Sequence, residues 1–285
     1  MVRLKESTIS TYYRSYEIYI KPFFFGIKKI DEDSITEFTK YLLFKVSHKT
    51  ANDVLTLLDT ILRYNKIDVE IYKPHFQVPV IESLTSAEWV KLEDYCITHL
   101  NVLTYCILLD LYTGIRPGEL CASKKENLDL INREFNVTST MQRIKNLDLE
   151  ATQKTKIIID APKSQKSVRS IPLIDDLVAI GINLYQGIPS HAFLLTGKTD
   201  HYIEVRTLEN KINEIYAEVG IQNRTLYTLR HSFATNFYYL TNDIKTLSEL
   251  LGHADIKTTY RYIYTDDSRK RQGVNSLVFG RKCRS

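Results

Sequence analysis

The sequence predicts a mainly α-helical protein with one small antiparallel β-sheet. Apolar residues recur at helical spacing toward both ends of the chain, which is typical of amphipathic helices. Between these helical parts, β-branched residues gather in short runs that are typical of strands. The 285 residues, of which 44% are hydrophobic and 25% charged, are enough to bury a sizeable core in one or two domains.

The first eighty residues have the pattern of short amphipathic helices. Apolar residues recur at helical spacing up to Pro22, where we expect the first helix to end, and again from Ala51 to Tyr64. The pattern lapses around Pro74 and Pro79, both of which oppose helix. We therefore predict a small helical domain over residues 1–80.

The remaining residues, 81–285, are predicted to form a second domain, α-helical with one β insertion. Thr85 and Glu88 match a capping box, and the chain then stays helical and strongly apolar to Leu120. Strand-like runs follow, at Glu134 to Thr140, Lys156 to Asp160 and Val168 to Leu173. Helical periodicity returns at Val205, with breaks at Gly220, Gly252 and Gly273.

Composition argues against several classes of protein. No apolar run is long enough for a signal peptide or a membrane span, so we expect an intracellular protein with no membrane partner. The four cysteines form no CxxC pair, and neither a disulfide framework nor a zinc site is indicated. The net charge of +4 is small, but basic residues concentrate over residues 154–169 and from Arg269 onward. Both runs could face phosphates, and a solvated surface is the alternative interpretation.

Two arginines lie in unusual settings. Arg116 follows Gly114 closely, where a tight backbone presents its side chain to a pocket, although an ordinary surface arginine is the alternative. Arg230 lies in an otherwise apolar, small-residue helix, so its guanidinium is expected to be semi-buried. Such a cation needs an anionic partner, and either a phosphate or a carboxylate would serve.

A histidine and a tyrosine complete the group of candidate residues. His253 follows the helix break at Gly252, where a capping or core histidine is the alternative interpretation. Tyr260, Tyr262 and Tyr264 alternate along the chain. In a helix the first and last would share one face, and Tyr262 would point away from both.

These segments read TGIRPGEL, LRHSFAT and ELLGH, with Tyr262 nine residues after the histidine, and they occur in this order. The sequence therefore resembles the tyrosine recombinase (phage integrase) family, most of all the integrases of bacterial mobile elements. The resemblance covers Leu84 to about Asp267, and APKSQKSVRSIPL looks like the family's β-hairpin lysine segment. It implies a helical core-binding domain and a catalytic domain that together form a clamp on DNA.

The resemblance implies the chemistry of three residues. Arg116 and Arg230 would grip the nonbridging oxygens of the scissile phosphate, a task that suits the forked geometry of guanidinium groups. Tyr262 would attack the phosphorus to form a 3′-phosphotyrosine. Positioned cations can replace a metal ion in phosphoryl transfer, so no metal and no cofactor is expected.

Supporting roles follow from the same resemblance. Lys163 would protonate the departing 5′ oxygen, with Lys166 as the competing candidate. His253 would donate a hydrogen bond to the phosphate, and Glu119 would support the arginines from behind.

One position departs from the family pattern. Tyr227 stands three residues before Arg230, where the family usually has a histidine. A phenol with a pKa of about 10 is a poor general base near neutrality, although its hydroxyl can still orient a phosphate. We predict that Tyr227 binds the phosphate and that Tyr262 loses its proton to the phosphate or to solvent, and the resemblance places the adjacent His231 outside the catalytic set.

The resulting hypothesis is site-specific recombination between double-stranded DNA sites, for integration or excision of a mobile element. Resolution of cointegrates or chromosome dimers by the same chemistry, a type IB topoisomerase-like activity and a non-enzymatic DNA-binding role are the alternatives. The resemblance implies a homotetramer on DNA in the cytoplasm, associated with the nucleoid, with a possible accessory DNA-bending or directionality factor. The tail, about residues 268–285, would be exchanged between protomers or pack on its own domain.

Overall fold

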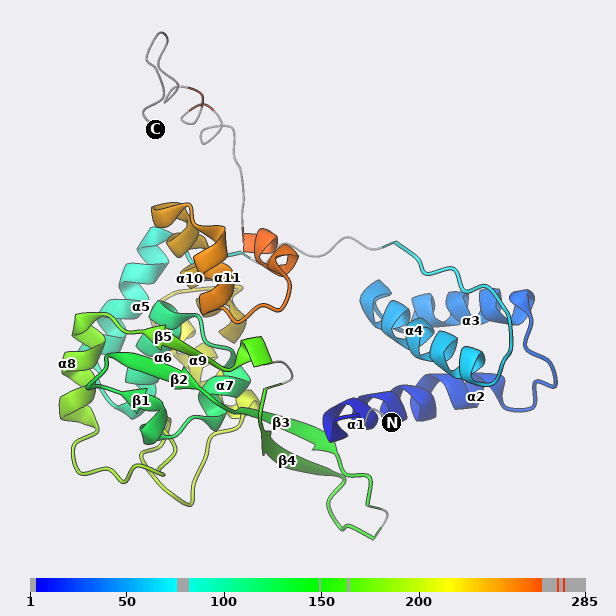
Figure 1. The fold of residues 1–285 in the computed structure, drawn as a ribbon, viewed down its shortest axis with the longest axis horizontal. Helices are drawn as coiled ribbons and strands as arrows, with labels where there is room; N and C mark the ends of the chain where they lie inside the picture. The colour runs from blue at the N-terminus through cyan, green and yellow to red at the C-terminus, as the bar shows by residue number, and fades with distance from the viewer. Residues whose placement is uncertain are drawn as a thin grey trace. The chain divides into compact units, whose positions relative to one another are not determined.

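The computed structural model describes residues 4–75, 82–148, 150–162 and 165–262, together with Arg271 and Val274. The chain divides into two compact units (Figure 1). The first comprises Met1–Pro79 and Gln142–Ile158, and the second comprises Val80–Met141 and Ile159–Ser285.

The first unit is built from helices around an apolar and aromatic core. Its helical elements are α1 (Glu6–Ser15), a π-helical turn (Tyr16–Ile20), α2 (Lys21–Phe24), α3 (Glu32–Lys45) and α4 (His48–Tyr64). The side chains of Asp31 and Ser47 cap α3 and α4 by accepting hydrogen bonds from backbone N–H groups. The fully buried Phe38 ring packs against Phe23 and Phe24, with ring centroids 4.9 and 5.0 Å apart. These aromatic contacts hold α2 against α3.

The helical path through Pro22 differs from the prediction. The sequence indicated that a helix ends there, yet α2 continues to Phe24. The π-helical turn ends at Ile20, so the proline falls in the first turn of α2, where its missing N–H removes no hydrogen bond within that helix.

The second unit is organised around α6 (Val102–Thr113), a helix that is apolar on every side and buries nine of its twelve residues. The helices α5, α8 and α10 pack against it. The Thr85–Glu88 capping box predicted for α5 is present, with both reciprocal hydrogen bonds. The other helices of this unit are α5 (Ser86–Thr98), α7 (Pro117–Ala122), α8 (Asp175–Leu184), α9 (Val205–Glu218), α10 (Leu226–Thr241) and α11 (Ile244–Leu250), with 3₁₀ turns at Lys125–Asn127, Gln165–Ser167 and Ile256–Tyr262.

A three-stranded antiparallel sheet belongs to the second unit. Its strands are β1 (Leu128–Asp129), β2 (Glu134–Val137) and β5 (Arg169–Pro172), in the order β1-β2-β5. Phe135 pairs with Ile171, and Val137 pairs with Arg169. Because side chains alternate across a strand, this register puts Arg169 on the same inward face as the buried Ile171.

The predicted fold class, mainly helical with small antiparallel sheets, is confirmed. The sheet content was incompletely predicted, because β3 (Thr140–Lys145) and β4 (Thr155–Asp160) form a separate two-stranded sheet. The predicted strand from Glu134 to Thr140 covers the whole of β2 and ends at the first residue of β3. None of the helices in the described ranges is long and apolar enough to cross a bilayer.

Candidate active site

The turn between α6 and α7 positions Arg116. Gly114 ends α6 in the left-handed conformation, with φ of 60°, and a Cβ there would lie 2.4 Å from the Phe233 ring. Only glycine satisfies both the conformation and the close approach. Arg116 follows as the N-cap of α7, and its guanidinium donates to Glu119 Oε1 at 2.7 Å and to the Gly252 carbonyl at 3.1 Å.

Arg230 lies in α10 with 3% of its surface exposed. Its guanidinium donates to the Gly114 carbonyl at 2.6 Å and to the Leu251 carbonyl at 2.8 Å. These carbonyls lie at the C-terminal ends of α6 and α11, where helices leave unpaired acceptors and a partial negative charge. Burial, with help from the nearby Arg116, lowers the pKa of Arg230 to about 10, so it remains a cation at neutral pH.

A third arginine, Arg169, joins the site from β5. It forms a two-pronged ion pair with Glu119, at 3.2 and 3.0 Å, and donates from Nε to the Leu250 carbonyl at 2.5 Å. Burial alone would raise the pKa of Glu119, but Arg169 and Arg116 outweigh it and hold that pKa below its ordinary value. Glu119 is therefore an anion shared by two arginines.

His253 lies within hydrogen-bonding distance of Arg230. Its Nε2 is 3.0 Å from Arg230 Nη2, and its Nδ1 is 2.7 Å from the Thr259 hydroxyl. A guanidinium can only donate, so Nε2 accepts and the ring proton resides on Nδ1. Burial and the neighbouring Arg230 lower the pKa of His253 to about 3, which makes it a neutral imidazole.

Tyr262 is buried at the end of the 3₁₀ turn, whereas Tyr260 is 56% exposed. This difference matches the predicted alternation, and Tyr264 lies outside the described residues. The Tyr262 ring is nearly parallel to His253, with centroids 5.9 Å apart, and Tyr262 lies close enough to Arg230 to influence the pKa of that guanidinium. Its ring also contacts His231, at a centroid separation of 4.6 Å.

The remaining predicted residues are Tyr227, Lys163 and Lys166. Tyr227 lies in the first turn of α10, and about half of its surface is exposed. Lys163 lies outside the described residues. Its rival, Lys166, donates to the carbonyl of Ala254 at 3.3 Å and so lies next to the segment that carries His253.

The structure thus brings five of the predicted residues into one cluster: Arg116, Glu119, Arg230, His253 and Tyr262. Sequence reasoning did not assign Arg169 or His231 to it. Three guanidinium groups against one carboxylate leave two net positive charges, which suits a ligand with several anionic oxygens. Within the described ranges, no group of three or more potential metal ligands gathers.

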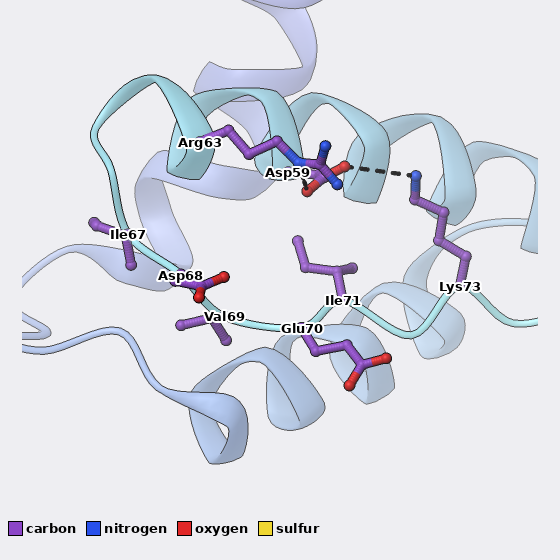
Figure 2. A pocket seen from close by; sticks show the side chains of 8 residues that line it. All are labelled: Asp59, Arg63, Ile67, Asp68, Val69, Glu70, Ile71 and Lys73. Atoms are coloured by element: carbon purple, nitrogen blue, oxygen red, sulfur yellow. Dashed lines mark hydrogen bonds and ion pairs between the residues drawn. The ribbon is translucent and has the colours of Figure 1, made fainter.

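A pocket of the first unit contains none of these residues (Figure 2). It lies between α4 and the segment that follows it. Three of its charged groups pair with one another, because Asp59 accepts from Arg63 at 2.8 Å and lies 4.0 Å from the Lys73 ammonium. We therefore do not regard this pocket as a candidate active site.

Comparison with known proteins gives a consistent result. The model of the phage integrase family matches residues 82–269. A XerC-like tyrosine recombinase of Caldanaerobacter subterraneus subsp. tengcongensis is 25% identical over 212 residues, covering 69% of this chain and 54% of that protein. The tyrosine recombinase XerA of Pyrococcus horikoshii is 26% identical over 270 residues, covering 92% and 85%.

Among solved structures, the Tn1549 transposon integrase in complex with transposon right end DNA has a similar fold. The TM-score is 0.73 at 18% identity, covering 96% of this chain and 94% of that one. The chain spans about half the length of the XerC-like recombinase that it matches.

Proposed function

Because the chain belongs to the phage integrase family of tyrosine recombinases, we propose that it catalyses site-specific recombination of double-stranded DNA. The observation that carries this proposal is the cluster of Arg116, Arg230, His253 and Tyr262 in one buried, cationic site. A tyrosine hydroxyl beside two guanidinium groups is the arrangement that an attack on a phosphodiester requires.

Arg116 and Arg230 would bind the scissile phosphate. In the described part of the chain, Arg116 uses two of its five N–H donors, for Glu119 and Gly252, and about a third of its side chain is exposed. The remaining donors can meet nonbridging oxygens, and each charge-assisted hydrogen bond strengthens as charge grows in the transition state. The helix-end carbonyls that hold both guanidiniums fix them before DNA arrives.

The covalent step conserves the energy of the phosphodiester. The oxygen of Tyr262 would attack the phosphorus while the bond to the 5′ oxygen breaks, leaving a 3′-phosphotyrosine and a free 5′-hydroxyl. Attack by a 5′-hydroxyl from another strand reverses the step without a nucleotide cofactor. Lys163 would protonate the departing oxygen, and Lys166, which lies beside the His253 segment, is its rival.

Tyr227 and His253 would bind the same phosphate. The exposed hydroxyl of Tyr227 lies one helical turn before Arg230 and can donate to an oxygen. His253 donates its proton to Thr259 in this structure, so donation to the phosphate would require the ring to exchange partners.

Residues 1–80, which form the helical part of the first unit, would act as the core-binding domain, and residues 81–285 as the catalytic domain. Charge supports DNA contact by the β3–β4 sheet as well, because Arg143, Lys145 and Lys154 are exposed on it or beside it. Such side chains bind phosphates without reading sequence. Together the two domains would clamp the duplex.

Assembly would involve four copies on two DNA sites, with tail exchange between them. The tail at about residues 268–285 lies outside the described residues except for Arg271 and Val274. An apolar groove on α10, lined by Phe233, Phe237 and the exposed Leu240, offers a surface for an apolar segment such as the tail's Leu277 to Phe279.

We further propose integration or excision of a mobile element as the biological role, in the cytoplasm at the nucleoid. Resolution of dimers would use the same site, and exchange between two labelled sites in the presence of accessory proteins separates the two roles. Strand exchange of any kind would argue against a topoisomerase-like monomer.

A nicked duplex tests the chemistry. The Tyr262→Phe variant first selects its site from a pool of randomised duplexes, and that site is then prepared with a nick that lets the cleaved strand diffuse away. Wild-type protein should form a covalent adduct with this duplex, and Tyr262→Phe should bind it equally well and form none. Binding by the wild type without an adduct would leave only a non-enzymatic DNA-binding role.

A further inference from the structure

The contact between His231 and Tyr262 indicates a group that could accept the proton of Tyr262. His231 follows Arg230 in α10, and Tyr262 ends the 3₁₀ turn after α11, so the fold brings together two rings 31 residues apart. Their centroids are 4.6 Å apart and their planes are tilted by 55°, so the two rings are in contact. Among the described residues, neither nitrogen of His231 has a hydrogen-bond partner.

Other groups around Tyr262 are poorly suited to take its proton. Arg230 is already protonated, and both nitrogens of His253 are engaged, one by Arg230 and the other by Thr259. Tyr227 is a half-exposed phenol, and a phenol is a poor general base near neutrality.

The charge state of His231 suits an acceptor. Burial, followed by the effect of Arg230 on the same helix, lowers the pKa of His231 to about 4, so its ring is a neutral base at physiological pH. The titratable groups that face the two rings are Arg230 from α10 and His253 from the segment after α11. Three further arginines act on the pKa of His253: Arg116, Arg169 and Arg261. An anionic phosphate bound by these arginines would raise the pKa of His231 from this low value and make it a stronger base, while leaving the ring unprotonated at neutral pH.

We propose that His231 accepts the proton of Tyr262 during cleavage, a role that rests on the proposed recombinase function. In this step the Tyr262 proton moves to an unprotonated imidazole nitrogen, and the tyrosine oxygen forms its bond to phosphorus. The bond to the 5′ oxygen breaks, and that oxygen takes a proton from the general acid. In the rejoining step the imidazolium returns its proton to the departing tyrosine oxygen.

The pH dependence of single-turnover cleavage tests this role. The duplex is the nicked site selected by the Tyr262→Phe variant, and adduct formation is followed between about pH 6 and 8.5. Wild-type cleavage should vary little across this range, because the acceptor is already unprotonated. In His231→Asn, solvent must remove the phenolic proton, so the rate should fall about 10²–10⁴-fold at neutral pH and rise about tenfold per pH unit.

Two further variants separate proton transfer from packing. His231→Phe keeps an aromatic ring against Tyr262 and should show the same steep pH dependence as His231→Asn. His231→Ala opens space, and added imidazole should restore its cleavage rate, which a purely structural role would not allow. The exposed His191→Asn is the matched control and should behave like the wild type.

The outcomes are distinguishable. Wild-type adducts together with a flat pH profile in His231→Asn, or with no rescue by imidazole, would overturn the role of His231 and leave the proposed function intact. A steep pH profile in Tyr227→Phe, with none in His231→Asn, would assign the proton to Tyr227 instead. A wild type that binds the site and forms no adduct would overturn both proposals.

Discussion

The two units bury different kinds of residue. In the first unit the described core is apolar and aromatic, with Phe38, Leu42 and Leu55 fully enclosed. The second unit encloses Asp110, Glu119 and Arg230, each with no more than 3% of its surface exposed. The interior of the first unit therefore provides stability alone, whereas the interior of the second also holds its chemistry.

The charged interior has a physical cost that the fold offsets locally. A buried ion is destabilising unless hydrogen bonds and opposite charge replace the lost water. The ends of α6 and α11 supply carbonyls to the three arginines, and Glu119 supplies the counter-charge. The second unit is thus less stable than one with an apolar interior would be, but its arginines are already in place when a phosphate binds.

The largest expected effect is a loss of stability in the first unit when its aromatic core is opened. Phe38→Ala should cost this unit about 3–5 kcal/mol of stability, because it leaves a cavity among packed rings. The only tryptophan, Trp89, lies in the second unit, so its fluorescence should report an unchanged transition there while circular dichroism shows the loss. Phe44→Ala is the matched control on the same helix, since Phe44 is 90% exposed. A shifted Trp89 transition in Phe38→Ala would show that the units unfold together.

The second prediction breaks the ion cluster of the other unit. Glu119→Gln keeps the size of the side chain and removes the charge shared by Arg116 and Arg169, so unit 2 should lose about 3–5 kcal/mol. Urea unfolding followed by Trp89 fluorescence measures the loss, and covalent adduct formation should fall with it. The exposed Glu126→Gln is the control. A stable and fully active Glu119→Gln would remove the carboxylate from the site.

The same contrast explains what could be read from the sequence. Arg116 and His253 were predicted because glycine breaks flank them, and glycines at helix ends mark backbone positions that other residues avoid. Arg230 was predicted because a cation stood among apolar neighbours. In the first unit, an apolar pattern predicts helices and a core but contains no residue whose chemistry stands out.

Two neighbours of the cluster could not be found in this way. The inward position of Arg169 depends on the strand register, although its spacing of two residues from Ile171 was a usable signal. The contact of His231 with Tyr262 depends on how α10 packs against the last 3₁₀ turn. Such tertiary contacts leave no local pattern, and the separate β3–β4 sheet was missed for the same reason.

A third prediction concerns Arg169 as a positioning residue. Arg169→Lys keeps the charge, but a single ammonium cannot reach Glu119, Ser167 and the Leu250 carbonyl together. We expect a loss of about 1–3 kcal/mol in stability and a slower cleavage rate at unchanged affinity for the DNA site. Arg133→Lys, at an exposed ion pair with Asp175, should change neither quantity. Weaker DNA binding in Arg169→Lys would instead indicate that Arg169 contacts the phosphate.

The smallest effect concerns how the buried groups of unit 2 respond to pH. His231 and His253 have pKa values lowered to about 4 and about 3, so below pH 6.5 the unfolded chain takes up their protons first and stability falls as the pH falls. Asp110 acts in the opposite direction. Burial raises its pKa well above the ordinary value, so the unfolded chain loses this proton first and stability falls as the pH rises.

Each proton contributes at most about 1.4 kcal/mol per pH unit, so Asp110 should offset part of the stability that the two histidines cost the second unit below pH 6.5. Neither carboxyl oxygen of Asp110 has a hydrogen-bond partner among the described residues, and Asp110→Asn removes the proton without changing the shape. Without this offset, the variant should lose stability more steeply than the wild type as the pH falls below 6.5, as measured by urea unfolding with Trp89 fluorescence. A wild-type pH profile in this variant would show that Asp110 is ionised in the folded protein, with Arg230 as its counter-charge.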